Sequence, residues 1–258
     1  MNKRVLIAGF TGAMGAETIR LIASLEGFEV VAGLAPHAQK DPLKYGLNKN
    51  VKIFNSLAEI PANVADIWVD FTSPSAVFEN IEFALKHHIR PLVGTTGLSE
   101  KQETTLVKLA QKEKLGGLIA PNFGMSAVLL MKFAREAAKY FPDVEIIEMH
   151  HADKKDAPSG TALATAKLIS QVREAHESAP NEETLENVRG GDYQGIKIHS
   201  VRLPGYIAHE QVLFGAKGEA LTIRQDSFDR SSFMSGVKVG LEKIMNLKQL
   251  VIGLENIL

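Results

Sequence analysis

The stretch from Glu148 to Thr161 contains the densest group of residues that could carry out chemistry. It includes two adjacent histidines, His150 and His151, at the end of an apolar strand pattern. Neighbouring side chains on a strand point to opposite faces, so the pair does not readily share a metal ion, and we predict no metal site. A single imidazole facing a cleft is instead suited to donate a proton near neutral pH.

Downstream of the histidines, Pro158-Ser159-Gly160-Thr161 opens a helical pattern. Ser159 is a favourable N-cap residue, and the N–H groups of Gly160 and Thr161 would point outward as an anion site at the helix N-terminus. Lys154 adds a positive charge in the preceding loop. These features predict a pocket for a small substrate that carries a carboxylate. A solvated charged loop before an ordinary capped helix would give the same pattern.

The beginning of the chain predicts a nucleotide-binding turn. The apolar run Val5–Ala8 leads into a G-x-x-G-x-x-G loop, Gly9 to Gly15, and then into a helical pattern. Glycines here permit a tight turn and close approach of the backbone to a pyrophosphate, which the N–H groups of the following helix would bind. The strand–turn–helix context is what the motif requires. The alternative is a glycine-rich turn that binds nothing.

Polar and small residues follow three further predicted strands. They are the segments Asp70-Phe71-Thr72-Ser73-Pro74, Gly94-Thr95-Thr96-Gly97 and Ala120-Pro121-Asn122-Phe123-Gly124. The carboxyl edge of a doubly wound sheet is where such a fold binds its ligand, and these residue types suit a ribose and a nicotinamide. Each segment alone could be ordinary turn chemistry, but three on one edge favour a dinucleotide site.

The tip of the second predicted strand bears on the choice between NADH and NADPH. NAD-specific folds place a carboxylate there to bind the ribose hydroxyls, whereas this strand ends in Leu34-Ala35-Pro36-His37. A 2′-phosphate would meet no repulsion, and His37 or Lys40 could approach it. We therefore predict that NADPH is used at least as well as NADH.

The elements that must position these residues fall into two halves. Six short apolar runs alternate with helical patterns up to residue 120, which predicts an α/β fold with a Rossmann-like, doubly wound parallel sheet. The second half predicts helices at Ser126–Tyr140 and from Ser159 to about His176, a strand at Val144–His151, a surface loop at Glu177–Tyr193, and three later strands. This pattern indicates an α+β domain with an antiparallel or mixed sheet. A helix at about Ser231–Met245 and a short apolar tail follow.

Composition excludes several classes of protein. The 258 residues are 45% hydrophobic, and 29 basic residues against 30 acidic ones give a net charge of −1. This balance argues against a protein devoted to nucleic acid or to an anionic membrane surface. The chain has no cysteine, so it has no disulfide, no thiolate zinc site and no cysteine nucleophile. No apolar run approaches a membrane span, and we expect a soluble cytoplasmic protein.

Five motifs resemble one family when they are taken together and in order. They are G-x-x-G-x-M-G, D-F-T-x-P, V-G-T-T-G, A-P-N-F and the long segment E-x-H-H-x-x-K-x-D-A-P-S-G-T. In this order they resemble the 4-hydroxy-tetrahydrodipicolinate reductase (dihydrodipicolinate reductase) family, and the resemblance covers essentially the whole chain. The departure lies at Ala35-Pro36, where many members carry an acidic residue followed by arginine.

The resemblance implies a role for each matching position. His150 matches the proton donor and Lys154 the second catalytic residue, while His151, Gly160 and Thr161 match substrate-binding positions. The implied reaction is the NAD(P)H-dependent reduction of (2S,4S)-4-hydroxy-2,3,4,5-tetrahydrodipicolinate to 2,3,4,5-tetrahydrodipicolinate with loss of water, in lysine and diaminopimelate biosynthesis. The family is typically a homotetramer. The implied contacts with NADPH or NADH are Gly9, Phe10, Thr11, Gly12, Ala13, Met14, Gly94, Thr95, Thr96, Ala120, Pro121, Asn122 and Phe123.

Three segments are expected on this interpretation: a dinucleotide-binding domain at 1–123, a substrate-binding and oligomerisation domain at 124–230, and a C-terminal segment at 231–258 that returns to the first domain. Two alternatives remain from the residues themselves. One is an NAD(P)-dependent amino-acid dehydrogenase of related fold, and the other is a non-catalytic NAD(P)-sensing protein. Aspartate-semialdehyde dehydrogenase is excluded because it needs a cysteine nucleophile.

Overall fold

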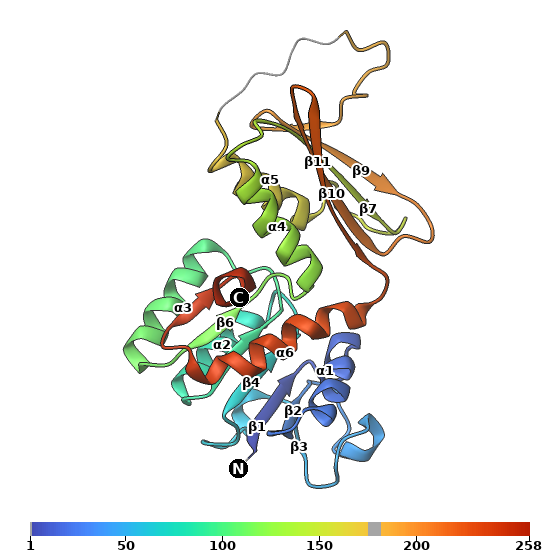
Figure 1. Cartoon of the computed structure of the whole chain (residues 1–258). Coiled ribbons are helices and arrows are strands. Elements are labelled where there is room, and N and C mark those ends of the chain that lie inside the picture. The colour runs from blue at the N-terminus through green and yellow to red at the C-terminus, as the bar shows by residue number, and fades with distance from the viewer. Residues whose placement is uncertain (1, 175–181) are drawn as a thin grey trace. The chain divides into compact units, whose positions relative to one another are not determined.

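A computed structural model describes residues 2–174 and 182–258. The chain divides into two compact units. The first contains the residues up to Phe123 together with Phe233–Leu258, and the second is Gly124–Ser232. Each unit has its own sheet (Figure 1).

The first unit is built on a seven-stranded sheet in the order β12-β6-β5-β4-β1-β2-β3. Every pairing in it is parallel. The order reverses at β1, as in a doubly wound nucleotide-binding fold. The predicted Rossmann-like sheet is therefore confirmed. The strands are β1 (Lys3–Ala8), β2 (Phe28–Leu34), β3 (Lys52–Phe54), β4 (Ile67–Asp70), β5 (Arg90–Val93), β6 (Gly117–Ile119) and β12 (Leu250–Ile252).

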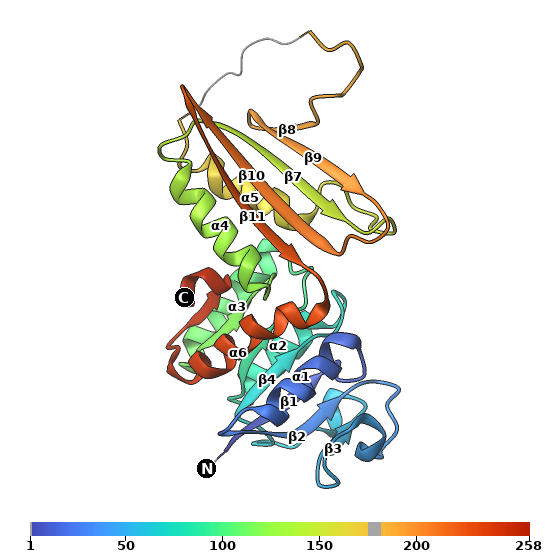
Figure 2. The ribbon, with the colours of Figure 1, turned by 45° about the vertical axis from the view of Figure 1, so that its right-hand side comes forward.

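Helices cover both faces of this sheet (Figure 2). Its central strands hold buried apolar runs, residues 5–8 in β1 and 67–69 in β4, as parallel strands between helices must. On β5, Val93 joins the apolar cluster formed with α2 and α3, while Leu92 faces α6. The helices are α1 (Ala13–Ser24), α2 (Val77–Lys86), α3 (Glu100–Glu113) and α6 (Met234–Lys243).

The C-terminal part of this unit differs from the sequence prediction in two ways. The predicted helix at Ser231–Met245 consists of a 3-10 turn at Arg230–Phe233, then α6, then a second 3-10 turn at Ile244–Asn246. The apolar tail is the edge strand β12, which pairs with β6. Three residues are too few to show a strand period, so only the pairing reveals it. The segment between β2 and β3 holds a further 3-10 turn, Pro42–Tyr45.

The second unit is a five-stranded sheet in the order β11-β10-β7-β9-β8, with α4 and α5 packed together on one face (Figure 2). Strands β7 and β9 are parallel and the other pairs are antiparallel, so the sheet is mixed. The elements are α4 (Met125–Ala137), β7 (Asp143–His150), α5 (Gly160–Ser170), β8 (Gly191–Tyr193), β9 (Ile196–Arg202), β10 (Ala208–Ala216) and β11 (Glu219–Ser227).

Two predictions for this unit need correction. The predicted surface loop at Glu177–Tyr193 ends in strand β8, which pairs with β9 through the turn at Gln194-Gly195. Residues 177–181 of that loop lie outside the described part of the chain. Helix α5 ends at Ser170 rather than near His176, and residues 175 and 176 also lie outside the described part.

Alternation along β7 decides which residues face the helices. Val144, Ile146 and Glu148 are fully or nearly fully buried on the covered face. His150 follows Glu148 on that same face, because residues two apart on a strand share a side. The edge of the covered face, where β7 ends and α5 begins, therefore holds a histidine next to a buried carboxylate.

Candidate active site

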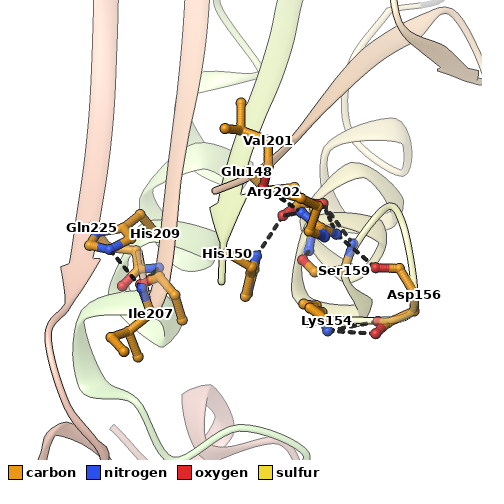
Figure 3. Close-up of polar contacts among 12 residues, drawn as sticks. Glu148, His150, Lys154, Asp156, Ser159, Val201, Arg202, Ile207, His209 and Gln225 are labelled. Carbon is orange, nitrogen blue, oxygen red and sulfur yellow. Dashed lines mark hydrogen bonds and ion pairs between the residues drawn. The ribbon is translucent and has the colours of Figure 1, made fainter. Parts of the chain in front are cut away.

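Glu148 is the centre of a polar cluster in the second unit (Figure 3). Its side chain is fully buried, and one carboxylate oxygen lies 2.5 Å from Nδ1 of His150. The guanidinium of Arg202 donates to both carboxylate oxygens, at 2.7 and 2.8 Å. The backbone N–H of Ser159 donates to the carboxylate at 3.2 Å. One buried acid thus holds groups from β7, β9 and the start of α5.

These contacts fix the charge of Glu148 and the tautomer of His150. Burial alone would raise the pKa of Glu148, but hydrogen bonds from His150, Arg202 and Ser200 lower it to about 2. The group is therefore a carboxylate at neutral pH and can only accept hydrogen bonds. Nδ1 of His150 must carry the hydrogen between them, which leaves Nε2 as the nitrogen that can exchange a proton with a ligand.

Arg202 also fastens the loop that follows β7. Besides binding Glu148, it donates to the main-chain oxygen of Asp156 at 2.7 Å. Within the same loop the Lys154 ammonium binds both carboxylate oxygens of Asp156, at 2.7 and 2.8 Å (Figure 3). The hydrogen bond from Lys154 holds the pKa of Asp156 below its usual range. A substrate carboxylate that binds Lys154 would therefore share the ammonium with Asp156.

The start of α5 has the predicted cap. Ser159 is its N-cap, and the side-chain oxygen accepts a hydrogen bond from the N–H of Ala162 at 3.1 Å. Gly160 is exposed, with no atom within 4 Å of where a Cβ would lie. Thr161 is half-buried beside it. The open space at Gly160 leaves room for a ligand to approach the first N–H groups of the helix, where anions bind.

The structure brings some of the predicted substrate residues together. His150 and Ser159 both contact Glu148, so the histidine and the N-terminus of α5 are neighbours. Lys154 lies in the loop between them and faces Asp156. His151 is exposed, just beyond the last residue of β7.

In the first unit, the glycine loop has the close packing that a nucleotide site requires. Gly9 has a φ of +79°, and a Cβ there would lie 2.2 Å from the carbonyl oxygen of Phe71. A Cβ at Gly15 would lie 2.4 Å from the carbonyl oxygen of Gly9. Gly12 is the N-cap of α1. The loop thus keeps bare backbone in front of a helix N-terminus, which fits a dinucleotide pyrophosphate.

A cavity of about 400 Å³ lies along this loop. It extends from Gly9 and Gly12 past Ala35 and Pro36 to Thr72 and Ser73. Of the three predicted strand-end segments, only the one that follows β4 lines this cavity, and the segments 94–97 and 120–124 do not. Its full lining is Gly9, Thr11, Gly12, Leu34, Ala35, Pro36, Asn55, Ser56, Leu57, Phe71, Thr72, Ser73, Ala76, Glu79 and Asn80.

The fully buried carboxyl of Asp70 organises two of these strand ends. It accepts hydrogen bonds from the Thr72 hydroxyl at 2.6 Å and the Thr95 hydroxyl at 2.7 Å. It also binds the Trp68 indole N–H at 3.0 Å and the Asn80 amide at 2.9 Å. The loops after β4 and β5 are therefore fixed to one acid at the carboxyl edge of the sheet.

Two predicted cofactor residues have side chains that belong to the core. Phe10 is buried and makes an edge-to-face contact with Tyr45, with ring centres 5.0 Å apart. Phe123 is buried against Phe71, with ring centres 6.0 Å apart. Only their backbone atoms are left to face a ligand. Ala13, Thr96 and Pro121 are exposed, Met14 and Asn122 are half-buried, and Gly94, Thr95 and Ala120 are half-buried or buried.

Two side chains after the end of β2, those of His37 and Lys40, are the candidates for binding a 2′-phosphate. The Lys40 ammonium binds Glu59 at 2.5 Å and the main-chain oxygen of Ile53 at 3.0 Å. His37 is exposed. Neither side chain lines the cavity, whereas Ala35 and Pro36 do. Lys40 would have to leave Glu59 before it could bind a 2′-phosphate.

No pattern in the sequence assigns a role to Glu148, Arg202 or Asp70. Glu148 could have been found, because it stands two residues before His150 on a predicted strand and therefore on the same face. Arg202 could not, because it lies 54 residues from Glu148 and reaches it only through the parallel pairing of β9 with β7. Asp70 was visible as a strand end, but its partners were not.

Among residues 2–174 and 182–258, no helix has the length and apolar character needed to cross a membrane. In the same residues, no group of three histidine or acidic side chains is arranged to hold a metal ion.

Comparison with known proteins identifies a family across both units. The family model described as "Dihydrodipicolinate reductase, N-terminus" matches residues 3–123. The model described as "Dihydrodipicolinate reductase, C-terminus" matches residues 126–258. The chain is 72% identical to 4-hydroxy-tetrahydrodipicolinate reductase of Lactobacillus acidophilus, covering 100% of this chain and 99% of the relative. It is 66% identical to that of Limosilactobacillus fermentum, covering 99% of both.

A solved structure agrees with these relatives. Dipicolinate-bound dihydrodipicolinate reductase from Paenisporosarcina sp. TG-14 superposes with a TM-score of 0.91 at 47% identity, over the full length of both chains. The predicted resemblance, the fold class, the NAD(P)H-dependent reductase activity and the place in lysine biosynthesis are thereby confirmed. The chain belongs to the dihydrodipicolinate reductase family.

Proposed function

We propose that this chain reduces 4-hydroxy-tetrahydrodipicolinate to tetrahydrodipicolinate with His150 as the proton donor. The observation that carries the proposal is the contact between His150 Nδ1 and the buried carboxylate of Glu148, at 2.5 Å. It orients the imidazole and leaves Nε2 to deliver a proton. That proton balances the hydride that the ring accepts, while water is lost from the substrate.

We assign the substrate carboxylates to the start of α5 and the loop before it. The N–H groups of Gly160 and Thr161 begin a capped helix, and Lys154 supplies a positive charge. A carboxylate gains from both, because helix N-termini and ammonium groups each favour anions. We also place His151 among the substrate contacts, because its position matches a substrate-binding position of the family. The dipicolinate bound by the Paenisporosarcina relative is a ring of this kind with two carboxylates.

The nucleotide belongs to the first unit in this proposal. A nicotinamide cofactor supplies the hydride when it is bound. The loop Gly9–Met14 binds its pyrophosphate by backbone N–H groups, and the ends of β5 and β6, Gly94–Thr96 and Ala120–Phe123, position the nicotinamide. Asp70 contributes indirectly, because its carboxyl accepts hydrogen bonds from Thr72 and Thr95 and so positions them.

Both NADPH and NADH serve as hydride donors in this proposal. Ala35 and Pro36 line the cavity without an acid, so no carboxylate on that strand tip grips the ribose hydroxyls or repels a 2′-phosphate. No arginine is placed there to bind a phosphate tightly. NADPH is therefore used at least as well as NADH, and dual use is the expected outcome.

The resemblance to the family also supports a proposal about the cellular setting and the assembly of the chain. We assign the chain to the cytoplasm, as a homotetramer that binds a small cyclic dicarboxylate and neither nucleic acid nor membrane. We assign nucleotide binding to residues 1–123 and substrate binding and oligomerisation to residues 124–230. Of the C-terminal segment 231–258, Phe233–Leu258 belong to the first unit. Light scattering of the purified protein would measure the number of subunits.

A steady-state assay with both cofactors tests the proposed reaction. Oxidation of NADPH and NADH is followed with the freshly generated cyclic substrate, and in parallel with keto acids and ammonia. Turnover with the cyclic substrate alone is expected. Turnover with keto acids would favour an amino-acid dehydrogenase. Cofactor binding without any turnover would favour an NAD(P)-sensing protein.

A further inference from the structure

Glu210 is a second buried acid in the unit that holds Glu148. It lies on β10 with 2% of its surface exposed, directly opposite Glu148 on β7 and Gln225 on β11. Its carboxyl oxygen lies 2.6 Å from the hydroxyl of Thr165 on α5. None of the proposed catalytic steps uses this residue, so its burial needs another explanation.

Counting hydrogens around Thr165 indicates the protonation state of Glu210. The Thr165 hydroxyl oxygen lies 2.6 Å from Glu210 and 3.0 Å from the main-chain oxygen of Thr161. A hydroxyl carries one hydrogen, whereas a main-chain oxygen and a carboxylate carry none. If Glu210 is a carboxylic acid, it donates to Thr165, and Thr165 donates to Thr161. Both contacts are then two-centre hydrogen bonds, whereas with a carboxylate the single Thr165 hydrogen must be shared between Glu210 and the Thr161 oxygen.

The surroundings of Glu210 favour the same neutral form. On β7 it faces the carboxylate of Glu148, whose charge is already matched by Arg202 of β9. On β11 it faces the neutral Gln225, and Lys167 of α5 is exposed. The face that α4 turns to this sheet is apolar. Burial raises the pKa of Glu210 to about 7, and the charge of Glu148 acts in the same direction. A hydrogen bond donated by Thr165 to the ionised form acts against them.

We propose that Glu210 is a neutral acid that positions the first turn of α5 for a substrate carboxylate. The inference rests on the proposed substrate site at Gly160 and Thr161. Through Thr165, Glu210 holds the Thr161 carbonyl in the helical direction, so that the N–H groups at Gly160 and Thr161 face outward. Thr165 is one helical turn from Thr161, about 6 Å along the axis. A negative charge at Glu210 would therefore lie close enough to repel an incoming carboxylate.

The pH dependence of KM tests this role, with the sign set by the proton. When Glu210 loses its proton above about pH 7, one hydrogen is lost from the hydrogen bonds that link Glu210 to Thr165 and Thr165 to Thr161. A buried negative charge appears at the same time. In wild type, the KM of the cyclic substrate should rise about tenfold between about pH 6 and about pH 9, the size expected for one partly screened charge at about 10 Å. Any change in kcat with pH that comes from the proton donor should not depend on Glu210, because His150 keeps its contact with Glu148.

Glu210→Gln is the decisive variant. Its amide N–H donates to Thr165 as the neutral acid does, but it cannot ionise. The extra rise in KM seen in wild type should disappear in this variant. The rise caused by groups common to both proteins, such as Lys154, cancels in the ratio of the two profiles. Glu219→Gln, which removes an exposed acid from the neighbouring strand β11, should keep the wild-type profile.

Two further measurements separate the possible failures. Infrared difference spectra against Glu210→Gln should show a protonated carboxyl band in wild type at about pH 6 that fades by about pH 9. If the two KM profiles run parallel, or if that band is absent, the assignment of Glu210 is overturned. If Lys154→Ala and Gly160→Pro leave KM unchanged, the substrate site itself is wrong, whatever Glu210 does. Thr165→Val should raise KM across the whole pH range, because it removes the hydroxyl that links Glu210 to Thr161.

Discussion

The two units of this molecule build their sites from different materials. In the first unit the proposed nucleotide site is mostly backbone: glycines 9, 12 and 15 stand where a side chain would collide or block approach. In the second unit the proposed catalytic site is a network of charged side chains around Glu148. A backbone site depends on neighbours in sequence. A charged network depends on strands that are paired from distant parts of the chain.

This difference has an energetic consequence. Replacing a glycine in the loop forces the main chain itself to move, because the nearest atom to the new Cβ at position 9 is the carbonyl oxygen of Phe71. Replacing a member of the charged network leaves the backbone intact, but it leaves a buried side chain without its partner. This lowers the free energy of unfolding strongly when that side chain is ionised. A change in the glycine loop should weaken cofactor binding. A change in the charged network should lower kcat and alter how the free energy of unfolding depends on pH.

The largest effect is expected at His150. His150→Gln removes the exchangeable proton while leaving an amide that can still donate to Glu148. We expect kcat to fall by roughly 10² to 10⁴, the usual range for a general acid, with NADPH affinity little changed. Rapid-mixing and steady-state kinetics with the cyclic substrate measure both quantities. A kcat within a few-fold of wild type would show that another group donates the proton.

The next largest effect is expected at Glu148. Glu148→Gln leaves the Arg202 guanidinium without its charge partner, and the loss should be about 3 kcal/mol of the free energy of unfolding. The folded pKa of Glu148 is about 2, below its ordinary value of 4.5. Its contribution is therefore present above about pH 4.5 and is lost as the pH falls towards 2.

Urea unfolding of wild type and Glu148→Gln at several pH values checks this account. The gap between the two proteins should be full at neutral pH and shrink in acid. A constant gap from neutral pH down to about pH 3 would contradict the role given to the charge. Glu136→Gln replaces an exposed acid on α4 and is the matched control. It should change neither the free energy of unfolding at neutral pH nor its dependence on pH appreciably.

Gly9→Ala tests the backbone-built site. The residue has a φ of +79° and no room for a Cβ, so the substitution should cost about 1–3 kcal/mol in backbone strain and displace the phosphate-binding N–H groups. We expect the Kd for NADPH to rise at least tenfold, measured by fluorescence titration. Gly27→Ala is a useful control, because Gly27 also has a positive φ but open space around it. Equal Kd values for the two variants would mean that close packing at Gly9 does not shape the nucleotide site.

Lys154 and Thr161 distinguish side-chain from backbone binding within the substrate site. Lys154→Ala removes a charged hydrogen bond, worth about 1.5–3 kcal/mol, so kcat/KM should fall at least tenfold. Thr161→Ala keeps the backbone N–H and should lower kcat/KM by less. The comparison needs only steady-state kinetics at saturating NADPH. Equally small effects in both variants would place the carboxylate elsewhere.

The smallest expected effect concerns cofactor choice. Ala35→Glu adds an acceptor for the ribose hydroxyls and a negative charge against a 2′-phosphate. The ratio of kcat/KM for NADPH to that for NADH should move tenfold or more towards NADH, as follows from about 1.5–3 kcal/mol for a charged hydrogen bond. The measurement is made at fixed salt for wild type and variant. A strong wild-type preference for NADH, or an unchanged ratio in the variant, would contradict the role given to this strand tip.

The features that depend on local pattern can be predicted from the amino-acid sequence. The apolar runs with crossover helices, the loop from Gly9 to Gly15 and the Ser159 cap each follow from residues a few positions apart. Their physics is local, because turns, caps and helix N-termini form between near neighbours. The order of the motifs added the family, and with it the positions of His150 and Lys154.

Tertiary structure decided the rest. The parallel pairing of β9 with β7 brings Arg202 to Glu148, and strand β12 is recognised only by its pairing with β6. Thr165 and Glu210, 45 residues apart, meet because α5 packs on the sheet. Pairing between distant strands depends on how whole faces pack, and no short stretch of sequence records it. The charge states of Glu148 and Glu210 follow from that packing, because burial and partners set them.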